Sequence, residues 1–268
     1  MQAPPNAPLQ TIQREDGATI AYHRTPGKSP GKLVGVMFLG GSHSNMDGSK
    51  ALALEKWCQD EGRAFLRFDY FGHGQSSGAF TDGVIGRWAE DAVFALDHLT
   101  EGPQVLVGSS MGGWISMLVA RERPERLRGL IGLASAPDFT EDLMWQELSD
   151  DHRAEMARDG QVTLPNDYDP QQPYIITQRL IEDGKNHLLL RDPLNLKMPV
   201  RLIHGLKDPD VPWQTALKIQ DVLVSDDVEV QLVKNGDHRL SQASDLTRMI
   251  RTLAYLLNDL ENDESESA

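Results

Sequence analysis

A serine between two glycines is the first group in this sequence whose type and spacing indicate chemistry. The letters G-S-S-M-G occupy 108–112, directly after the apolar run Val105–Val107, and the run Trp114–Ala120 is typical of a helix. Glycines at both ends allow a strand and a helix to pass closely through a very sharp turn. Such a turn exposes the hydroxyl of Ser110 beside the free N–H groups of the helix N-terminus. We therefore interpret Ser110 as a candidate nucleophile rather than an incidental turn residue.

A nucleophilic serine needs a base and an acid, and two later loops offer them. The apolar run Val200–Ile203 predicts a strand, and Asp208 and Asp210 lie in the loop that follows it. The alternating run 228–233 predicts the next strand, after which comes His238. Imidazole titrates near neutrality, so it can take the serine proton and return it to the leaving group. Position alone leaves both aspartates open as the acid.

The order serine, acid, histidine along the chain is that of the α/β hydrolases, and two motifs strengthen this resemblance. The letters H-G-x-x-D-x-x-V-P fill 204–212 and G-D-H fills 236–238, like the acid and histidine loops of many family members. In that pattern the acid matches Asp208, not Asp210. The resemblance implies a Ser110, Asp208 and His238 triad that forms an acyl-enzyme and needs no cofactor.

More narrowly, the chain resembles the mitochondrial palmitoyl-protein thioesterases, also described as acyl-glucuronide esterases, among the α/β-hydrolase-domain proteins. The matching stretches, in order, are N-M-D-G-S-K-A-L-A at 45–53, R-F-D-Y at 67–70, V-G-S-S-M-G-G-W at 107–114, H-G at 204–205, V-P-W at 211–213 and D-H-R at 237–239. The mitochondrial members carry a transit peptide, whereas this chain starts close to its first expected strand. The resemblance therefore implies a related bacterial enzyme whose substrate need not be the same.

An acyl-transfer site also needs two backbone donors for the oxyanion. One is expected to be the N–H of Met111, the residue after the nucleophile. The other is expected in G-G-S at 40–42, after the apolar run 33–39, and by analogy with the family it is the N–H of Ser42. Gly40 replaces the histidine usual at that place, so a plain glycine-rich turn is the alternative for this loop.

The remaining candidate ligand groups predict no metal or cofactor. His43, His73 and His204 lie after expected strands, where each is expected to hydrogen-bond within its loop rather than act as a catalyst. The letters G-H-G-Q-S-S-G at 72–78 lack the third glycine of a dinucleotide-binding loop. No histidine pair has metal-ligand spacing, and Cys58 belongs to an amphipathic helix pattern.

Composition bounds the class of protein. The 268 residues suit one α/β domain, and a single cysteine excludes an internal disulfide and favours a reducing compartment. No apolar run reaches membrane-spanning length, and residues 1–8 lack the features of a signal or transit peptide. A net charge of −14 argues against nucleic acid and anionic membranes as partners. We therefore expect a cytoplasmic protein, and the sequence gives no indication of its oligomeric state.

Strand and helix patterns alternate along 1–268, which predicts one α/β-hydrolase domain whose mostly parallel, eight-stranded sheet has helices on both faces. The strands are expected near 8–13, 18–24, 33–39, 63–69, 103–108, 128–134, 199–204 and 227–233, and the helices near 49–61, 84–100, 112–122, 213–223 and 241–259. The acidic residues at 260–268 are expected to form a disordered tail.

The stretch 138–192 breaks this alternation and predicts a helical cap inserted in the domain. Its apolar residues recur at helical spacing, in the groups Leu143, Met144, Trp145 and Leu148, and Ile175, Ile176, Leu180 and Ile181. An apolar cap over the serine would accommodate an acyl chain, with Trp145 and Leu148 as candidate substrate contacts. The alternative is that these side chains only pack the cap onto the core.

The sequence therefore favours a serine hydrolase of the acyl-protein thioesterase or carboxylesterase type, acting on a small-molecule or S-acylated substrate. A serine peptidase of the same fold is the alternative enzyme, but amide cleavage usually requires an additional substrate-recruiting domain. A non-catalytic ligand-binding protein of this fold is the alternative outside enzymes. Such proteins can lose a triad member, whereas all three are present here.

Overall fold

The computed structural model describes residues 7–28, 33–165 and 173–266, with side chains up to residue 262. The strands of the main sheet are β1 (Leu9–Gln13), β2 (Thr19–Thr25), β3 (Gly35–Leu39), β4 (Phe65–Phe68), β5 (Gln104–Ser109), β6 (Leu127–Leu133), β9 (Val200–Gly205) and β10 (Val228–Val233). The long helices that accompany them are α1 (Ser49–Glu61), α2 (Ile85–Leu99), α3 (Met111–Glu122), α7 (Gln214–Val222) and α8 (Ala243–Glu266). Apart from the end of α8, these bounds agree with the sequence-based ones to within a few residues.

The eight strands form one sheet in the order β1-β2-β4-β3-β5-β6-β9-β10. From β4 to β10 every neighbouring pair is parallel, whereas β2 is antiparallel to both β1 and β4. This confirms the predicted mostly parallel, eight-stranded sheet. The carboxyl ends of the parallel strands share one edge, which is where ligands usually bind in such sheets.

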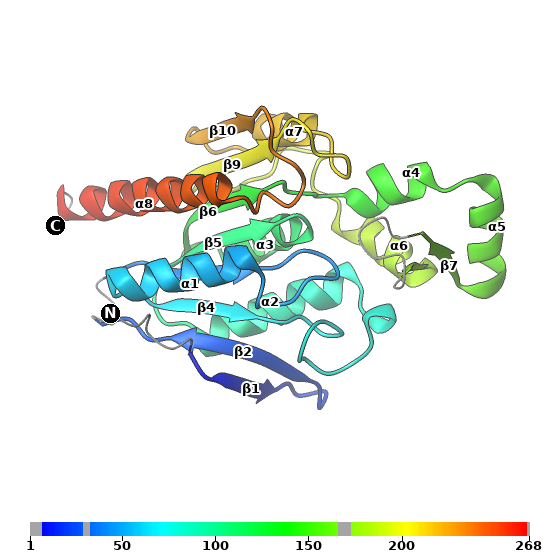
Figure 1. Ribbon diagram of the computed structural model, residues 1–268, viewed down its shortest axis with the longest axis horizontal. Coiled ribbons are helices and arrows are strands. Elements are labelled where there is room, and N and C mark those ends of the chain that lie inside the picture. The colour runs from blue at the N-terminus through cyan, green and yellow to red at the C-terminus, as the bar shows by residue number, and fades with distance from the viewer. Residues whose placement is uncertain (1–6, 29–32, 166–172, 267–268) are drawn as a thin grey trace.

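Helices cover both faces of this sheet (Figure 1). Residues of α2, α3 and α7 belong to one apolar cluster, and residues of α1 and α8 belong to another. Every residue of β3 and β5 is buried, as expected for parallel strands with helices on both sides. The central strands therefore form a tightly packed frame for the loops that follow them.

The last helix, α8, extends further than the sequence indicated. It runs to Glu266, whereas the expected end was residue 259 and a disordered tail was expected from 260. The carboxylate of Glu261 accepts the N–H of Val34 at 3.2 Å and pairs with the guanidinium of Arg63 at 2.8 Å, which ties this end of the helix to the core. Residues 267–268 of the predicted tail lie outside the described residues, as do residues 1–6 of the stretch that we expected to be neither a signal nor a transit peptide.

The segment 138–192, which we call the cap, lies between β6 and β9. It contains the short helices η3 (Thr140–Met144), α4 (Trp145–Glu147), α5 (Asp150–Asp159), α6 (Gln178–Gly184) and η4 (Lys185–His187), and the strands β7 (Gln161–Leu164) and β8 (Tyr174–Thr177). The cap is not purely helical, because β7 and β8 pair as an antiparallel hairpin. Ile175 and Ile176, expected in a helix, lie on β8, where β-branched residues are favoured. Figure 1 shows the cap beyond the carboxyl ends of the central strands.

Candidate active site

Ser110 is the single residue between β5 and α3, and its backbone is strained. Its φ of 55° and ψ of −120° lie in a region that side-chain-bearing residues rarely adopt. Its N–H donates to the carbonyl of Leu133 at 2.9 Å, and its carbonyl accepts the N–H of Ala136 at 3.1 Å. The end of β6 and the residues after it therefore hold the strained residue from both sides. Strain maintained in this way is a mark of functional positions.

The glycines on either side of Ser110 are required by close contacts. A Cβ on Gly112 would lie 2.1 Å from the carbonyl oxygen of Leu39, on the neighbouring strand β3. A Cβ on Gly108 would lie 2.3 Å from the carbonyl oxygen of Gly112 itself. Any side chain at either position would push α3 away from the sheet, so the G-x-S-x-G spacing is a packing requirement of this turn.

Three loops bring Ser110, His238 and Asp208 into one hydrogen-bonded chain. The Oγ of Ser110 lies 3.0 Å from the Nε2 of His238, and the Nδ1 of His238 lies 2.8 Å from the Oδ2 of Asp208. The side chain of His238 is 18% exposed, whereas that of Asp208 is fully buried. A neutral imidazole that donates its Nδ1–H to the carboxylate presents an acceptor at Nε2. The arrangement can therefore move the serine proton onto His238.

The carboxylate of Asp208 has partners on both oxygens. Its Oδ1 accepts the N–H groups of Asp210 at 2.9 Å and Val211 at 2.8 Å. Its Oδ2 faces the Nε2 of His204 at 3.3 Å as well as His238. Burial alone would raise the pKa of the Asp208 carboxyl, but hydrogen bonds from His204 and His238 hold that pKa well below its usual range. Asp208 is therefore ionised at neutral pH.

Asp210, the other candidate acid, lies close by but does not occupy the same place. It is exposed, and one of its carboxylate oxygens lies within 4.8 Å of ligand atoms of Asp208 and His238. The oxygen that contacts the Nδ1 of His238 belongs to Asp208. Within the described ranges these three residues are the one group close enough to hold a metal ion, but the hydrogen bond between His238 and Asp208 accounts for that pair without an ion.

The loop after β3 packs directly against the serine. A Cβ on Gly41 would lie 3.3 Å from the Cβ of Ser110. The hydroxyl of Tyr70 donates to the carbonyl of Gly40 at 3.3 Å, and the hydroxyl of Ser44 donates to the carbonyl of Gly41 at 2.7 Å. Both carbonyl oxygens are therefore engaged with the protein, which favours N–H groups rather than carbonyls facing the serine.

The two predicted oxyanion donors come from different sides of Ser110. Met111 is the first residue of α3, and N–H groups in the first turn have no acceptor within their own helix. Ser42 follows Gly41 in the loop, and its hydroxyl lies 2.9 Å from the Nδ1 of His43. Their use as oxyanion donors remains a prediction.

Two contacts to these loops were not anticipated from the sequence. The ammonium of Lys50, in the first turn of α1, donates to the carbonyl of Arg239, next to His238. His204, expected to hydrogen-bond within a loop, lies on β9, and its Nε2 contacts the carbonyl of Val211 at 3.0 Å and the carboxylate of Asp208 at 3.3 Å in the loop that follows. Both residues belong to stretches that carry the family resemblance, although sequence spacing did not identify their partners.

Trp145 and Leu148, the predicted substrate contacts, pack within the cap. Leu148 is 4% exposed and belongs to a small cluster with Met156, Val162, Ile176 and Ile181, against which Trp145 packs. The guanidinium of Arg153 lies 4.9 Å from the centre of the Trp145 ring. The structure gives neither residue a contact with Ser110. Leu143 packs against the main core, and Met144 packs against both the main core and the cap cluster.

The cap meets the catalytic end of the sheet at several points. The indole N–H of Trp114, on α3, donates to the carbonyl of His187 at 3.0 Å. The ring of His43, next to Ser42, lies 5.1 Å from that of Tyr174 on β8. The cap therefore contacts both the helix after Ser110 and the loop that packs against it.

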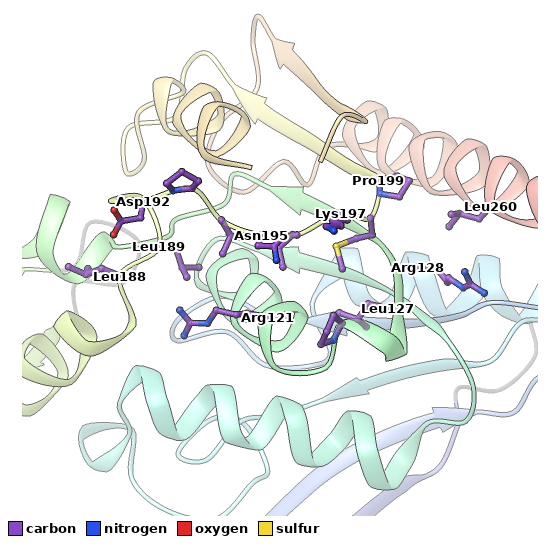
Figure 2. A pocket seen from close by; sticks show the side chains of 15 residues that line it. Arg121, Leu127, Arg128, Leu188, Leu189, Asp192, Asn195, Lys197, Pro199 and Leu260 are labelled. Atoms are coloured by element: carbon purple, nitrogen blue, oxygen red, sulfur yellow. The ribbon is translucent and has the colours of Figure 1, made fainter. Parts of the chain in front are cut away.

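A hollow of about 760 Å³ lies outside the group formed by Ser110, Asp208 and His238 (Figure 2). Leu127 and Pro199 line it, at the amino ends of β6 and β9, together with Arg121, Lys197 and Leu260. From there its lining continues past Asn195 to Leu188, Leu189 and Asp192 near the end of the cap (Figure 2). It contains none of the predicted site residues, and we assign it no catalytic role.

Comparison with known proteins gives consistent relatives. A family model described as the alpha/beta hydrolase fold matches residues 38–168. The palmitoyl-protein thioesterase ABHD10, mitochondrial, of Mus musculus is 40% identical over 254 residues, which cover 95% of this chain and 84% of the mouse protein. The Homo sapiens protein of the same name is 37% identical over 252 residues, with 94% and 81% of the two chains covered.

Solved structures indicate the same family as the sequence relatives. The alpha/beta hydrolase domain-containing protein 10 from mouse matches with a TM-score of 0.87 at 40% identity, over 95% of this chain and all of that one. A putative hydrolase from Agrobacterium vitis S4 matches with a TM-score of 0.88 at 39% identity, over 93% and 99% of the two chains. The named relatives are mitochondrial, so they do not support the expected cytoplasmic location. No helix of the described residues is long and apolar enough to cross a bilayer.

Proposed function

This chain is a hydrolase of the α/β-hydrolase family, related to the palmitoyl-protein thioesterases, and we propose that it cleaves acyl thioesters or carboxylic esters by a serine mechanism. The observation that carries the proposal is the hydrogen-bonded chain from Ser110 through His238 to Asp208, which starts at a strained residue between a strand and a helix.

In this mechanism the Oγ of Ser110 attacks the acyl carbonyl while the Nε2 of His238 takes its proton. Asp208, ionised and buried, holds the Nδ1–H of His238 and stabilises the imidazolium that forms. The backbone N–H groups of Met111 and Ser42 bind the oxygen that becomes negative. His238 then protonates the leaving thiol or alcohol. In the second half of the reaction His238 takes a proton from the water that attacks the acyl-enzyme, and it returns that proton to the Oγ of Ser110 as the carboxylic acid leaves.

The thioester preference is proposed from the names of the relatives, and the acyl pocket is proposed from the position of the cap. Thioesters are proposed because relatives at 37–40% identity are named palmitoyl-protein thioesterases. We propose that the cap covers the acyl chain, with Trp145 on its surface and Leu148 supporting the wall from within the cap cluster. The substrate is then a small acyl ester or an S-acylated molecule. A cytoplasmic location stays a prediction.

The proposal is tested by pre-steady-state hydrolysis of p-nitrophenyl esters and of S-acyl peptides. Wild-type protein should release a burst of nitrophenolate stoichiometric with enzyme if deacylation is the slower step, and turn over both substrate classes. Ser110→Ala should lose turnover by about 10⁶, as in other serine hydrolases. Unchanged turnover in Ser110→Ala would overturn the serine mechanism, whereas hydrolysis of esters but not thioesters would overturn the thioesterase proposal.

A further inference from the structure

One buried histidine beside the triad has no role in the mechanism above. His204 is the fifth residue of β9, is 1% exposed, and contacts the same carboxylate oxygen that His238 uses. We propose that His204 is a positioning residue that holds the Asp208 carboxylate in the orientation His238 requires, by donating its Nε2–H to that carboxylate. This inference rests on the proposed function, because it gives His204 a role in the same site.

The contacts of His204 fix which of its nitrogens carries a proton. Its Nε2 lies 3.0 Å from the carbonyl oxygen of Val211 and 3.3 Å from the Oδ2 of Asp208. A carbonyl and an ionised carboxylate are both acceptors only, so Nε2 must be the donor to both. The Nε2–H tautomer of His204 is therefore a direct requirement of the proposal.

The position of His204 explains why a second histidine is useful. Besides His238 itself, the donors to Asp208 include the N–H groups of Asp210 and Val211, which belong to its own loop and would move with it. His204 belongs to β9, which is paired with β6 on one side and β10 on the other. One N–H on the sheet thus ties down both the carboxylate and the carbonyl three residues later. Rigid elements hold catalytic groups more precisely than loops do.

His73 provides a matched control for a merely structural histidine. It is also buried, at 4% exposed, and its Nδ1 lies 3.2 Å from the carbonyl oxygen of Phe71. Its ring packs at edge-on angles against those of Tyr70, Phe80 and Trp88. None of these contacts involves Asp208 or His238, so replacement of His73 should disturb packing without reaching the triad.

The kinetic test compares His204→Gln with His204→Met, two side chains of similar length of which one retains an N–H donor. His204→Met should lower kcat by about 10- to 100-fold with KM within about twofold, because small displacements of catalytic groups cost this much. His204→Gln should recover kcat to within about threefold of wild type, and His73→Met should change it by less than about threefold. In an Asp208→Asn background His204→Met should have no further effect, since its action passes through that carboxylate. Equal kcat for the Gln and Met variants, or an undiminished effect in the Asp208→Asn background, would overturn the proposal.

A second measurement needs no folded Met variant and no turnover. In ¹⁵N-histidine-labelled wild-type protein, the resonances of His204 are assigned by their loss in His204→Gln. The proposal predicts that the Nε2 of His204 carries a proton, and a ring with Nε2 unprotonated would overturn it. This result is independent of the proposed function, which fails separately if Ser110→Ala retains hydrolysis.

Discussion

The catalytic loops and the cap are held in different ways. At the carboxyl ends of the central strands, a strained serine, two sterically required glycines and a buried carboxylate with partners on both oxygens leave little freedom. The cap has its own small apolar cluster, but its base also packs into the main core through Phe139, Leu180 and Leu189, and polar and ring contacts add to this attachment. The proposed chemistry therefore lies on the central sheet, whereas the segment proposed to choose the acyl group packs partly on itself and partly on the main core.

The stem of the cap shows how such a unit is attached. Asp138, at its start, is fully buried and accepts the N–H groups of Leu189 at 2.7 Å and Leu190 at 2.9 Å, at its end. Its carboxylate also pairs with Arg191 at 3.1 Å. The two ends of the cap are thus joined to each other where the cap leaves and rejoins the main domain.

The largest effect expected from a single charge is at Asp208. Asp208→Asn should lower kcat by about 10⁴, because an amide in place of the carboxylate no longer accepts the Nδ1–H of His238 in the reactive tautomer. Asp210→Asn should cost less than about tenfold, because the carboxylate oxygen 2.8 Å from the Nδ1 of His238 belongs to Asp208. The measurement is kcat on a p-nitrophenyl ester. A larger loss at Asp210 would show that the acid has been wrongly assigned.

Alanine substitutions at two glycines compare how tightly the catalytic loops and the cap are packed. A Cβ on Gly112 meets the backbone oxygen of Leu39 at 2.1 Å, so Gly112→Ala should lower the free energy of unfolding by more than about 4 kcal/mol. Gly160, in the cap, has a φ of +76° and no described atom within 4 Å of its Cβ position, so Gly160→Ala should cost only about 1–2 kcal/mol. Urea unfolding of both variants gives the two values. Similar losses would remove this distinction between the catalytic loops and the cap.

The smallest effects concern acyl-chain selection. Each buried methylene is worth about 0.8 kcal/mol, so kcat/KM should rise roughly three- to fourfold per added carbon until the site is full. Trp145→Ala should flatten this rise and leave kcat on the shortest ester unchanged. The profile is measured for acyl chains from about two to sixteen carbons. A flat or falling wild-type profile would contradict an acyl site under the cap and favour short esters or aromatic acyl conjugates.

The sheet and the triad loops were predictable because their signals are local. Parallel strands covered on both faces read as apolar runs, and the sharp turn at Ser110 leaves the G-x-S-x-G spacing in the sequence. Asp208 and His238 follow strands whose carboxyl ends share one edge of the sheet, so topology brings them together. Position did not distinguish Asp208 from Asp210; family resemblance favoured Asp208, and the structure places it at His238.

The cap and the end of α8 were less predictable because non-local contacts decide them. Ile175 and Ile176 fit a helical spacing, yet they lie on β8, where they pair with Thr163 and Val162 of β7. The stretch 260–268 is rich in acidic residues, yet Glu261 is held by Arg63, which lies 198 residues earlier in the sequence. The contact of His204 with Asp208 likewise depends on how the loop folds back over β9. Sequence periodicity carries none of this information.

The most direct test of the central claim is covalent labelling of Ser110. A fluorophosphonate reacts when an activated serine Oγ displaces fluoride from phosphorus, so it reports the nucleophile itself. We predict one label per wild-type molecule, mapped by peptide mass analysis to Ser110, with full labelling of Ser109→Ala and none of Ser110→Ala. Labelling that survives in Ser110→Ala would contradict the assignment, and a wild-type protein that takes no label would favour a non-catalytic ligand-binding protein of this fold.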